Sequence, residues 1–299
     1  MKKYFQLLFL LMIVTVLACT QEKPGNESQS SETQEQAADN TAQQDDSKQA
    51  GDDNKEEKPT QSKIDEFANT SLQKMFDFIA NTQKLKVNVA STFDVLQRNG
   101  QLIEFGGNTE WIIRRPDHVL IDSLSWEGDD RIFYFDGKDI TYYDSGHNVY
   151  AIAPKAGDLD QAFDYFVGKL NMPLPLTELF SVKHPFDLNT AVSSSKYLGE
   201  AILNGVDCDE FTFRFPDTDL QIWIKAGDQP LPQRVVITYK DSPGQPQYKA
   251  QFSDWDLSSV LPDKLFKFVP PKDSRKIIFA AGSRNTGNSA GKSEGETDK

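Results

Sequence analysis

RRPDHVLIDSLSWEGDDRIFYFDGKDITYYDSGHNVYAIA, residues 114–153, is the stretch that decides the fold class. Its apolar and aromatic residues come in short bursts, and each burst ends in turn-forming residues such as Pro, Asp, Gly or Asn. Asp136-Gly137 predicts a two-residue hairpin turn, because both central residues of such a turn need positive φ. The pattern predicts an antiparallel meander of four strands.

The predicted meander is apolar on both of its faces. Ile132 and Tyr134 fall on one side of an extended chain, and Phe133 and Phe135 fall on the other. Apolar side chains are disfavoured in water, so each face must be covered by another part of the chain. What covers the second face is therefore the question that bears on function.

Two segments have helical periodicity. Residues 62–65, Ser-Lys-Ile-Asp, resemble a capping box, and apolar residues follow at helical spacing to about Asn81. Asp158 is the predicted cap of a second helix, and prolines end this helix near residue 173. We interpret residues 158–192 as a helical insertion that covers one face of the sheet.

Strands are predicted on both sides of these elements. Residues 87–113 form a long hairpin around Asn99-Gly100, and Gly106-Gly107 marks a bend or bulge that curls the sheet. Strands resume near Lys196 and turn at Asn204-Gly205. Together, these strands and helices predict a mostly β (α+β) domain, a strongly curved antiparallel half-barrel of ten or eleven strands. No repeat of fixed period occurs, which disfavours a propeller or a solenoid.

Residues 1–18 have the layout of a secretory signal peptide, with a basic start, a short apolar run and a small residue before Cys19. The ending resembles the bacterial lipobox. This resemblance implies cleavage before Cys19 and its modification with acyl chains such as palmitate. Thr20 in place of Asp implies sorting to the outer membrane. The alternative is an ordinary signal cleaved near Ala18, which leaves a free thiol.

Residues 19–63 and 282–299 contain few apolar side chains and are predicted to be a disordered tether and a disordered tail. Residues 64–281 remain as one folded domain. The net charge of −13 argues against binding of nucleic acid, which needs clustered Lys and Arg. Cys208 is the second of only two cysteines, so lipidation of Cys19 leaves it without a disulfide partner, as a buried thiol.

The chain shows no catalytic constellation. The histidines lie far apart at positions 118, 147 and 184, and no serine stands in a nucleophile-elbow motif. Paired acidic residues occur in turns, where their side chains are common. For Asp217 and Asp219 the alternative to a purely structural role in the turn is a calcium site. We therefore predict a non-enzymatic protein with no metal and no cofactor.

Several motifs resemble known periplasmic half-barrels of the LolA/LolB type: Arg115-Pro116-Asp117, Tyr134 to Lys138, Leu231 to Arg234, and Phe266 to Pro271. The sequence resembles an uncharacterised family of predicted periplasmic proteins more closely. This second resemblance rests on residues 112–117, 131–144, 205–214 and 231–255. The resemblance implies an incomplete barrel whose apolar cavity, covered by helices, accepts acyl chains of lipoproteins.

The aromatic content of twenty Phe, nine Tyr and four Trp suits an apolar pocket at the mouth of a barrel. We predict that Trp111, Phe133, Phe135 and Trp223 face the concave side and bind a hydrophobic ligand. The first hypothesis is a lipid-anchored periplasmic binding protein for an acyl chain, lipid or lipoprotein. The alternative is an envelope protein-interaction or sensor module whose core is filled.

Overall fold

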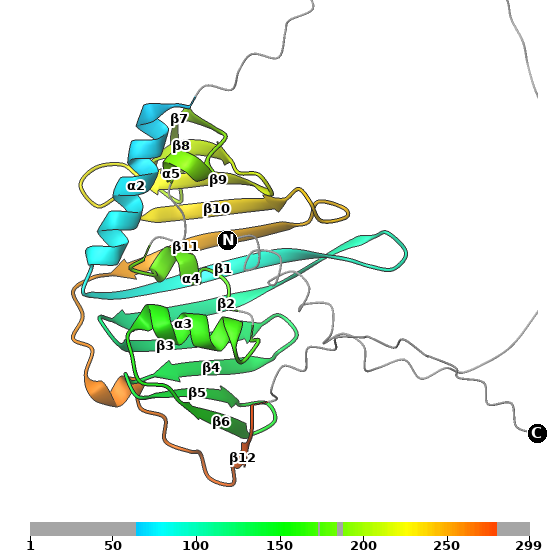
Figure 1. Ribbon diagram of the computed structural model, residues 1–299, viewed down its shortest axis with the longest axis vertical. Helices are drawn as coiled ribbons and strands as arrows, with labels where there is room; N and C mark the ends of the chain where they lie inside the picture. Colours follow the sequence, from blue (N-terminus) through cyan, green and yellow to red (C-terminus); the bar gives the residue numbers. More distant parts are fainter. Residues whose placement is uncertain (1–63, 173, 184–187, 280–299) are drawn as a thin grey trace, which may run out of the picture. The chain divides into compact units, whose positions relative to one another are not determined.

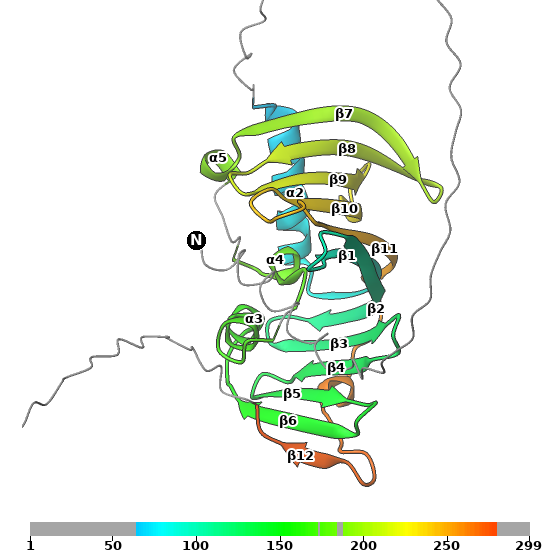
Figure 2. The same ribbon diagram turned by 90° about the vertical axis from the view of Figure 1, so that its right-hand side faces the viewer.

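The alternation of apolar and polar residues produces one large sheet. The computed structural model describes residues 64–172, 174–183 and 188–279. Within them twelve strands pair in the order β12-β6-β5-β4-β3-β2-β1-β11-β10-β9-β8-β7. Figure 1 shows these strands stacked from end to end of the domain, and in Figure 2 β7 and β8 bend strongly. The mostly β, curved antiparallel architecture is confirmed.

The strands in chain order are β1 (Lys84–Leu96), β2 (Leu102–Arg114), β3 (His118–Ser125), β4 (Asp130–Phe135), β5 (Asp139–Asp144), β6 (Val149–Pro154), β7 (Ser194–Leu203), β8 (Val206–Arg214), β9 (Thr218–Lys225), β10 (Pro232–Tyr239), β11 (Gln247–Asp256) and β12 (Arg275–Ile277). The sequence predicted ten or eleven strands. The three-residue β12, which pairs in parallel with β6, carries too little periodicity to be recognised.

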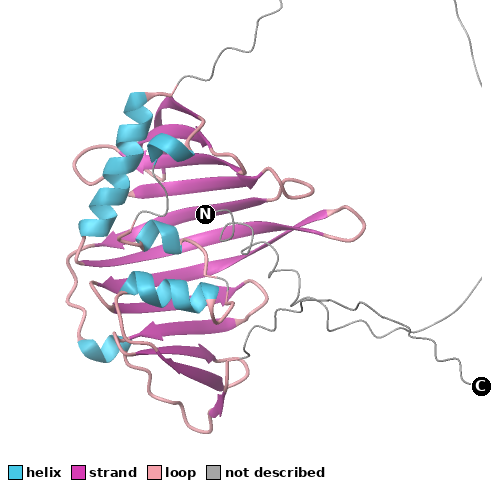
Figure 3. Ribbon diagram, in the orientation of Figure 1, coloured by secondary structure: helices cyan, strands magenta, loops and turns pink. Residues whose placement is uncertain are grey.

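The helices are α2 (Glu66–Asn81), α3 (Leu159–Gly168), α4 (Thr177–Phe180), α5 (Leu188–Ala191) and the 3-10 helix η1 (Asp263–Phe266). Figure 3 shows α2, α3, α4 and α5 in front of the sheet. Side chains of α2, α3 and α4 share one apolar cluster with the strands. The predicted insertion therefore does cover one face, which we call the concave face. None of the described helices is long and apolar enough to span a bilayer.

The N-terminus of α2 is capped differently from the prediction. Asp65 is the N-cap residue, and its carboxylate accepts hydrogen bonds from the backbone N–H groups of Ala68 and Tyr197. These bonds, that from Tyr197 above all, lower the pKa of Asp65. Ser62 lies outside the described residues. One carboxylate thus joins the helix start to the edge strand β7.

The two predicted hairpin turns have different outcomes. Asn204 and Gly205 both have positive φ, 51° and 79°, as a tight two-residue turn requires. At the other turn only Gly137 does, with φ 85°. The Asp136 carboxylate there accepts hydrogen bonds from the N–H groups of Lys138 and Asp139, so a longer turn replaces the predicted one.

Gly106 and Gly107 do not form a bulge. The pairing of β1 with β2 runs without a register shift through both positions. A Cβ on Gly106 would lie 2.7 Å from the Trp126 indole, and one on Gly107 would lie 2.5 Å from the Leu124 carbonyl oxygen. The two glycines instead permit close approach of these neighbours.

The C-terminal segment covers the second face of the meander, which we call the convex face. The ring of Phe268 lies 5.6, 5.4 and 5.0 Å from those of Tyr134, Tyr143 and Tyr150. Phe266 of η1 is buried with Ile112 in a second apolar cluster. Both faces of the meander are therefore covered by the chain itself. The predicted signal peptide, Cys19, the tether, His184 and the tail lie outside the described residues.

Candidate functional site

The four residues predicted to face a ligand do not gather in one place. Trp111, Phe133 and Phe135 lie on the concave face and are almost fully buried. Trp223 lies on the convex face, because it alternates with the buried core residues flanking it in β9. Its ring lies 5.8 Å from the guanidinium carbon of Arg234. The expectation that Trp223 faces the concave side is wrong, because the aliphatic residues of β9 occupy that side and Trp223 alternates with them.

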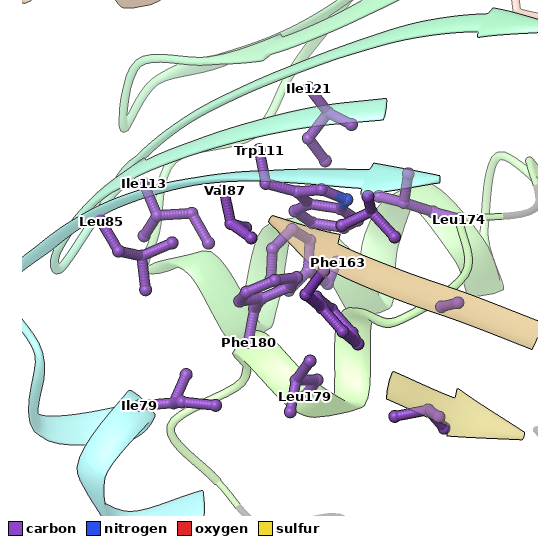
Figure 4. Close-up of a cluster of buried hydrophobic side chains, with 14 of the residues drawn as sticks. Ile79, Leu85, Val87, Trp111, Ile113, Ile121, Phe163, Leu174, Leu179 and Phe180 are labelled. Atoms are coloured by element: carbon purple, nitrogen blue, oxygen red, sulfur yellow. The ribbon is translucent and has the colours of Figure 1, made fainter. Parts of the chain in front are cut away.

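Helices fill the concave face in front of β2 to β4. The Trp111 ring lies 4.5 Å from that of Phe180 in α4, and Phe133 lies 4.5 Å from Phe166 in α3. Figure 4 shows Trp111 with Phe163, Phe180 and Leu179 gathered in one cluster. In this part of the domain, side chains of the insertion occupy the place that a ligand would need.

A buried arginine fastens α4 to the rest of the fold. The Arg115 guanidinium donates hydrogen bonds to the carbonyl oxygens of Thr82, Ile79 and Phe180, at 3.1, 3.2 and 2.8 Å. Burial lowers the pKa of Arg115, and the nearby Asp160 carboxylate partly offsets this effect. One side chain thus joins the end of α2 to the last residue of α4.

Asp160 performs the same task for α3. Its side chain is buried, and its two carboxylate oxygens accept hydrogen bonds from the N–H groups of Val182 and Lys183, each at 2.8 Å. These contacts hold the segment after α4 against the first turn of α3. The covering insertion is therefore anchored by polar contacts as well as by its aromatic side chains.

Beyond the helices, five apolar side chains continue the concave face across five strands. We call them the apolar row: Leu220, Ile237, Tyr248, Phe93 and Phe105. Each is the register partner of the next, on β9, β10, β11, β1 and β2. Tyr248 is buried and the other four are half-buried. In Figure 1 no labelled helix lies over the right-hand ends of β9, β10 and β11.

The polar groups beside the apolar row disfavour negative charge. Burial raises the pKa of Glu178, which stands on α4, although its side chain keeps some exposure to solvent. Burial also raises the pKa values of Tyr239 and Tyr248, and the neighbouring Glu178 adds to the shift of Tyr239. This part of the concave face thus suits an uncharged group better than an anion.

Neither His118 nor His147, the two histidines in the described part of the chain, belongs to a catalytic or metal-binding group. The Nδ1 atoms of His118 and His147 lie 2.6 and 3.0 Å from the carboxylates of Asp117 and Asp144, on different turns. No group of three His, Cys, Asp or Glu side chains in the described part of the chain could hold a metal ion. The Asp219 carboxylate, considered above for calcium, accepts hydrogen bonds from Arg214, and Lys240 lies 3.0 Å from it.

The apolar row is the part of the site that the sequence did not single out. Its members lie in strands that were predicted, and they alternate with polar residues as the buried core positions do. The missing signal is the position of the covering helices relative to these strands. Such coverage depends on tertiary packing and has no local signature.

Comparison with solved structures gives distant similarities. Lipoprotein LppX from Mycobacterium tuberculosis is 12% identical, with a TM-score of 0.41, over 66% of this chain and all of that chain. An uncharacterised conserved protein from Thermus thermophilus is 13% identical, with a TM-score of 0.38, over 70% and 99% of the two chains. A LolA superfamily protein from Nitrosomonas europaea is 11% identical, with a TM-score of 0.34, over 67% and 97%.

No curated protein sequence matches this chain. A family model does match it, over residues 68–280, which include nearly every helix and strand described above. The chain therefore belongs to the family described as predicted periplasmic protein (DUF2092).

Proposed function

We propose that this protein is a non-enzymatic, lipid-anchored periplasmic binding protein that holds an acyl chain of a lipid or lipoprotein against the apolar row. The observation that carries the proposal is the row itself. Four half-buried apolar side chains stand in register on the concave face through the buried Tyr248, and in Figure 1 no labelled helix lies over the right-hand ends of β9, β10 and β11.

The dimensions of the row suit a long acyl chain. It crosses four strand spacings, roughly 19 Å, which is the length of an extended long-chain acyl group. Each methylene removed from water contributes about 0.8 kcal/mol, so a chain laid along the row gains affinity along its whole length. The raised pKa values of Glu178 and Tyr239 support a ligand whose buried part is uncharged.

One observation favours the second candidate function, an interaction or sensor module with a filled core. The contacts of Trp111 with Phe180 and of Phe133 with Phe166 fill the concave face over β2 to β4. The apolar row then serves as a docking surface for an envelope protein instead of a lipid site. Ligand binding by the purified domain separates the two functions.

A fluorescent acyl chain supplied as an uncharged methyl ester tests the proposal. The wild-type domain should bind it, and Ile237→Ser should weaken binding at least fivefold. The matched control is Val236→Ser, because Val236 is the next residue of β10, is also half-buried and points to the convex face. Equal affinity of both variants, or no binding by the wild type, would contradict the acyl-binding function.

The anchor has its own test. Acylation of Cys19 would attach the protein firmly, because two or more acyl chains each contribute about 0.8 kcal/mol per buried methylene. The wild type should fractionate with outer membranes, and Cys19→Ala should be released in soluble form or keep its signal segment. Identical fractionation of the two proteins, with an unmodified mature terminus, would show that no lipid is attached.

A further inference from the structure

A groove with charged walls lies away from the apolar row. Its volume is about 690 Å³, and residues of β9, β10, β11 and the adjoining loops line it, among them Lys225, Leu231, Gln233, Asp254, Trp255 and Asp256. Lys225 ends β9 and Asp256 ends β11, whereas the apolar row uses the opposite ends of these strands. Known small-molecule sites have volumes in this range.

The negative wall of the groove has a fixed orientation. Asp254 has φ 54°, a conformation that L-residues other than Asn and Asp seldom adopt. Its Oδ2 accepts hydrogen bonds from Asn88 at 2.9 Å and from Ser253 at 3.0 Å, and these bonds lower the pKa of Asp254. Its Oδ1 accepts no hydrogen bond from a described residue. The charged Oδ1 atom of Asp254 is therefore available to accept a hydrogen bond from a ligand.

Asp256 adds a second negative charge to this wall. Its Oδ1 accepts hydrogen bonds from the N–H and hydroxyl groups of Ser258 and from the N–H of Ser259, and its Oδ2 is bonded to the Ser259 hydroxyl. These bonds lower the pKa of Asp256, so it is ionised at neutral pH. Its oxygens are occupied, which leaves Asp254 as the acceptor for a ligand.

The positive wall is Lys225. Within the described part of the chain its ammonium has neither a hydrogen-bond partner nor an ion-pair partner, although its side chain is only half-exposed. Lys225 and Asp254 lie on strands that flank β10, so their backbones are two strand spacings, roughly 10 Å, apart. The groove thus presents opposite charges on its two sides.

The floor between these charges combines polar side chains such as Gln233 with apolar ones, and the apolar part is rigid. Leu231 is almost fully buried, and the Trp255 indole N–H donates a hydrogen bond to the Pro232 carbonyl oxygen at 3.1 Å. The Trp255 ring also stacks on Phe252. Its one polar atom is therefore used inside the protein, and the ring offers only an apolar surface to the groove.

We infer that this groove binds a short peptide with free ends, whose terminal carboxylate pairs with Lys225 and whose terminal ammonium pairs with Asp254. An extended dipeptide or tripeptide separates its terminal charges by roughly 6–10 Å, which matches the gap between the walls once the lysine side chain reaches inward. Capture of peptide ends by complementary groups is a known mode of recognition. Leu231 and Trp255 contact the central side chain, and the extra charge of Asp256 favours basic over acidic peptides.

Calorimetric titration with the tripeptide Ala-Leu-Ala tests this inference on the intact protein. Lys225→Gln and Asp254→Asn should each weaken binding at least tenfold, and Asn preserves the backbone because it tolerates positive φ. Lys264→Gln, an exposed change of equal charge on η1, is the control and should bind as the wild type does. Thermal melting of each variant checks that it is folded.

The second arm of the test blocks the peptide. Acetylation of the amine or amidation of the carboxylate should each lower the affinity, and the doubly blocked peptide should not bind. The inference is overturned if millimolar Ala-Leu-Ala does not bind the wild type, if blocked and free peptides bind equally, or if only one of the two groove variants loses affinity. None of these peptide measurements depends on acyl binding, so the groove and the apolar row are tested separately.

Discussion

The indole of Trp111 packs against the ring of Phe180, with ring centroids 4.5 Å apart and planes inclined by 30°. The two residues are far apart in the sequence, and their contact brings the helical insertion onto the centre of the sheet. A filled region and the half-buried apolar row therefore share one concave face. The following predictions separate residues that support the fold from residues that hold a ligand.

Phe133→Ala should destabilise the domain without abolishing acyl binding. Phe133 is buried against Phe166, so its truncation leaves a cavity and should cost roughly 3–5 kcal/mol. Trp223→Ala on the convex face is the comparison. It loses a contact with Arg234 at a partly exposed site, which should cost about 1 kcal/mol. Urea unfolding of both variants measures the difference, and equal losses would contradict the packed arrangement.

Arg115→Met should loosen α4. The change removes the donor to three carbonyl oxygens, two of them in buried bonds, and should cost roughly 3 kcal/mol or more. Arg114→Met is the control, because Arg114 is the neighbouring residue but donates to one carbonyl oxygen, that of Leu261, and pairs with the exposed Asp263 carboxylate. Urea unfolding gives the free energies. If the two variants lose the same stability, Arg115 does not fasten the insertion.

Glu178→Gln should make stability less dependent on pH. Burial raises the pKa of Glu178 in the folded state above its unfolded value of 4.5. A raised pKa means that the folded state binds the Glu178 proton more tightly than the unfolded state does. The stabilisation from this proton is fully present below pH 4.5 and is lost as pH rises through the folded pKa. Gln stays neutral and avoids this loss. The melting temperature of the variant should exceed that of the wild type more at pH 8 than at pH 4; a constant difference would contradict the buried carboxyl.

Cys208 should react slowly with thiol reagents. Its side chain is buried and free, and burial raises its pKa, so little thiolate is present at neutral pH. Labelling with an aromatic disulfide reagent should be slow in buffer and fast in denaturant. Rapid labelling of the native protein would instead indicate an accessible, reactive thiol.

Local sequence signals predicted most elements of this fold. Asp158 forms the predicted cap of α3, in a capping box with Gln161, and Asn204-Gly205 forms the predicted turn. These features depend on residues close in sequence, so a single chain displays them. Trp223 was assigned to the wrong face although alternation along β9 separates it from the aliphatic residues of the core; its ring instead lies over the Arg234 guanidinium on the convex face.

Features that depend on distant residues could not be predicted. Phe268 covers three tyrosines of the convex face from a segment more than a hundred residues away. Gly106 carries a bend or bulge signal in sequence, yet the absence of a Cβ there permits close approach of the Ser91 carbonyl oxygen and the Trp126 ring. The apolar row appears only once the strand register and the ends of the covering helices are known.

Native mass spectrometry of the protein purified from its own envelope tests the central claim most directly. If the apolar row holds an acyl chain, the native mass should exceed the mass measured after denaturation in organic solvent by that of one lipid, and Ile237→Ser should reduce the lipid-bound fraction while Val236→Ser does not. Equal native and denatured masses for the wild type would contradict the binding function and leave the interaction module.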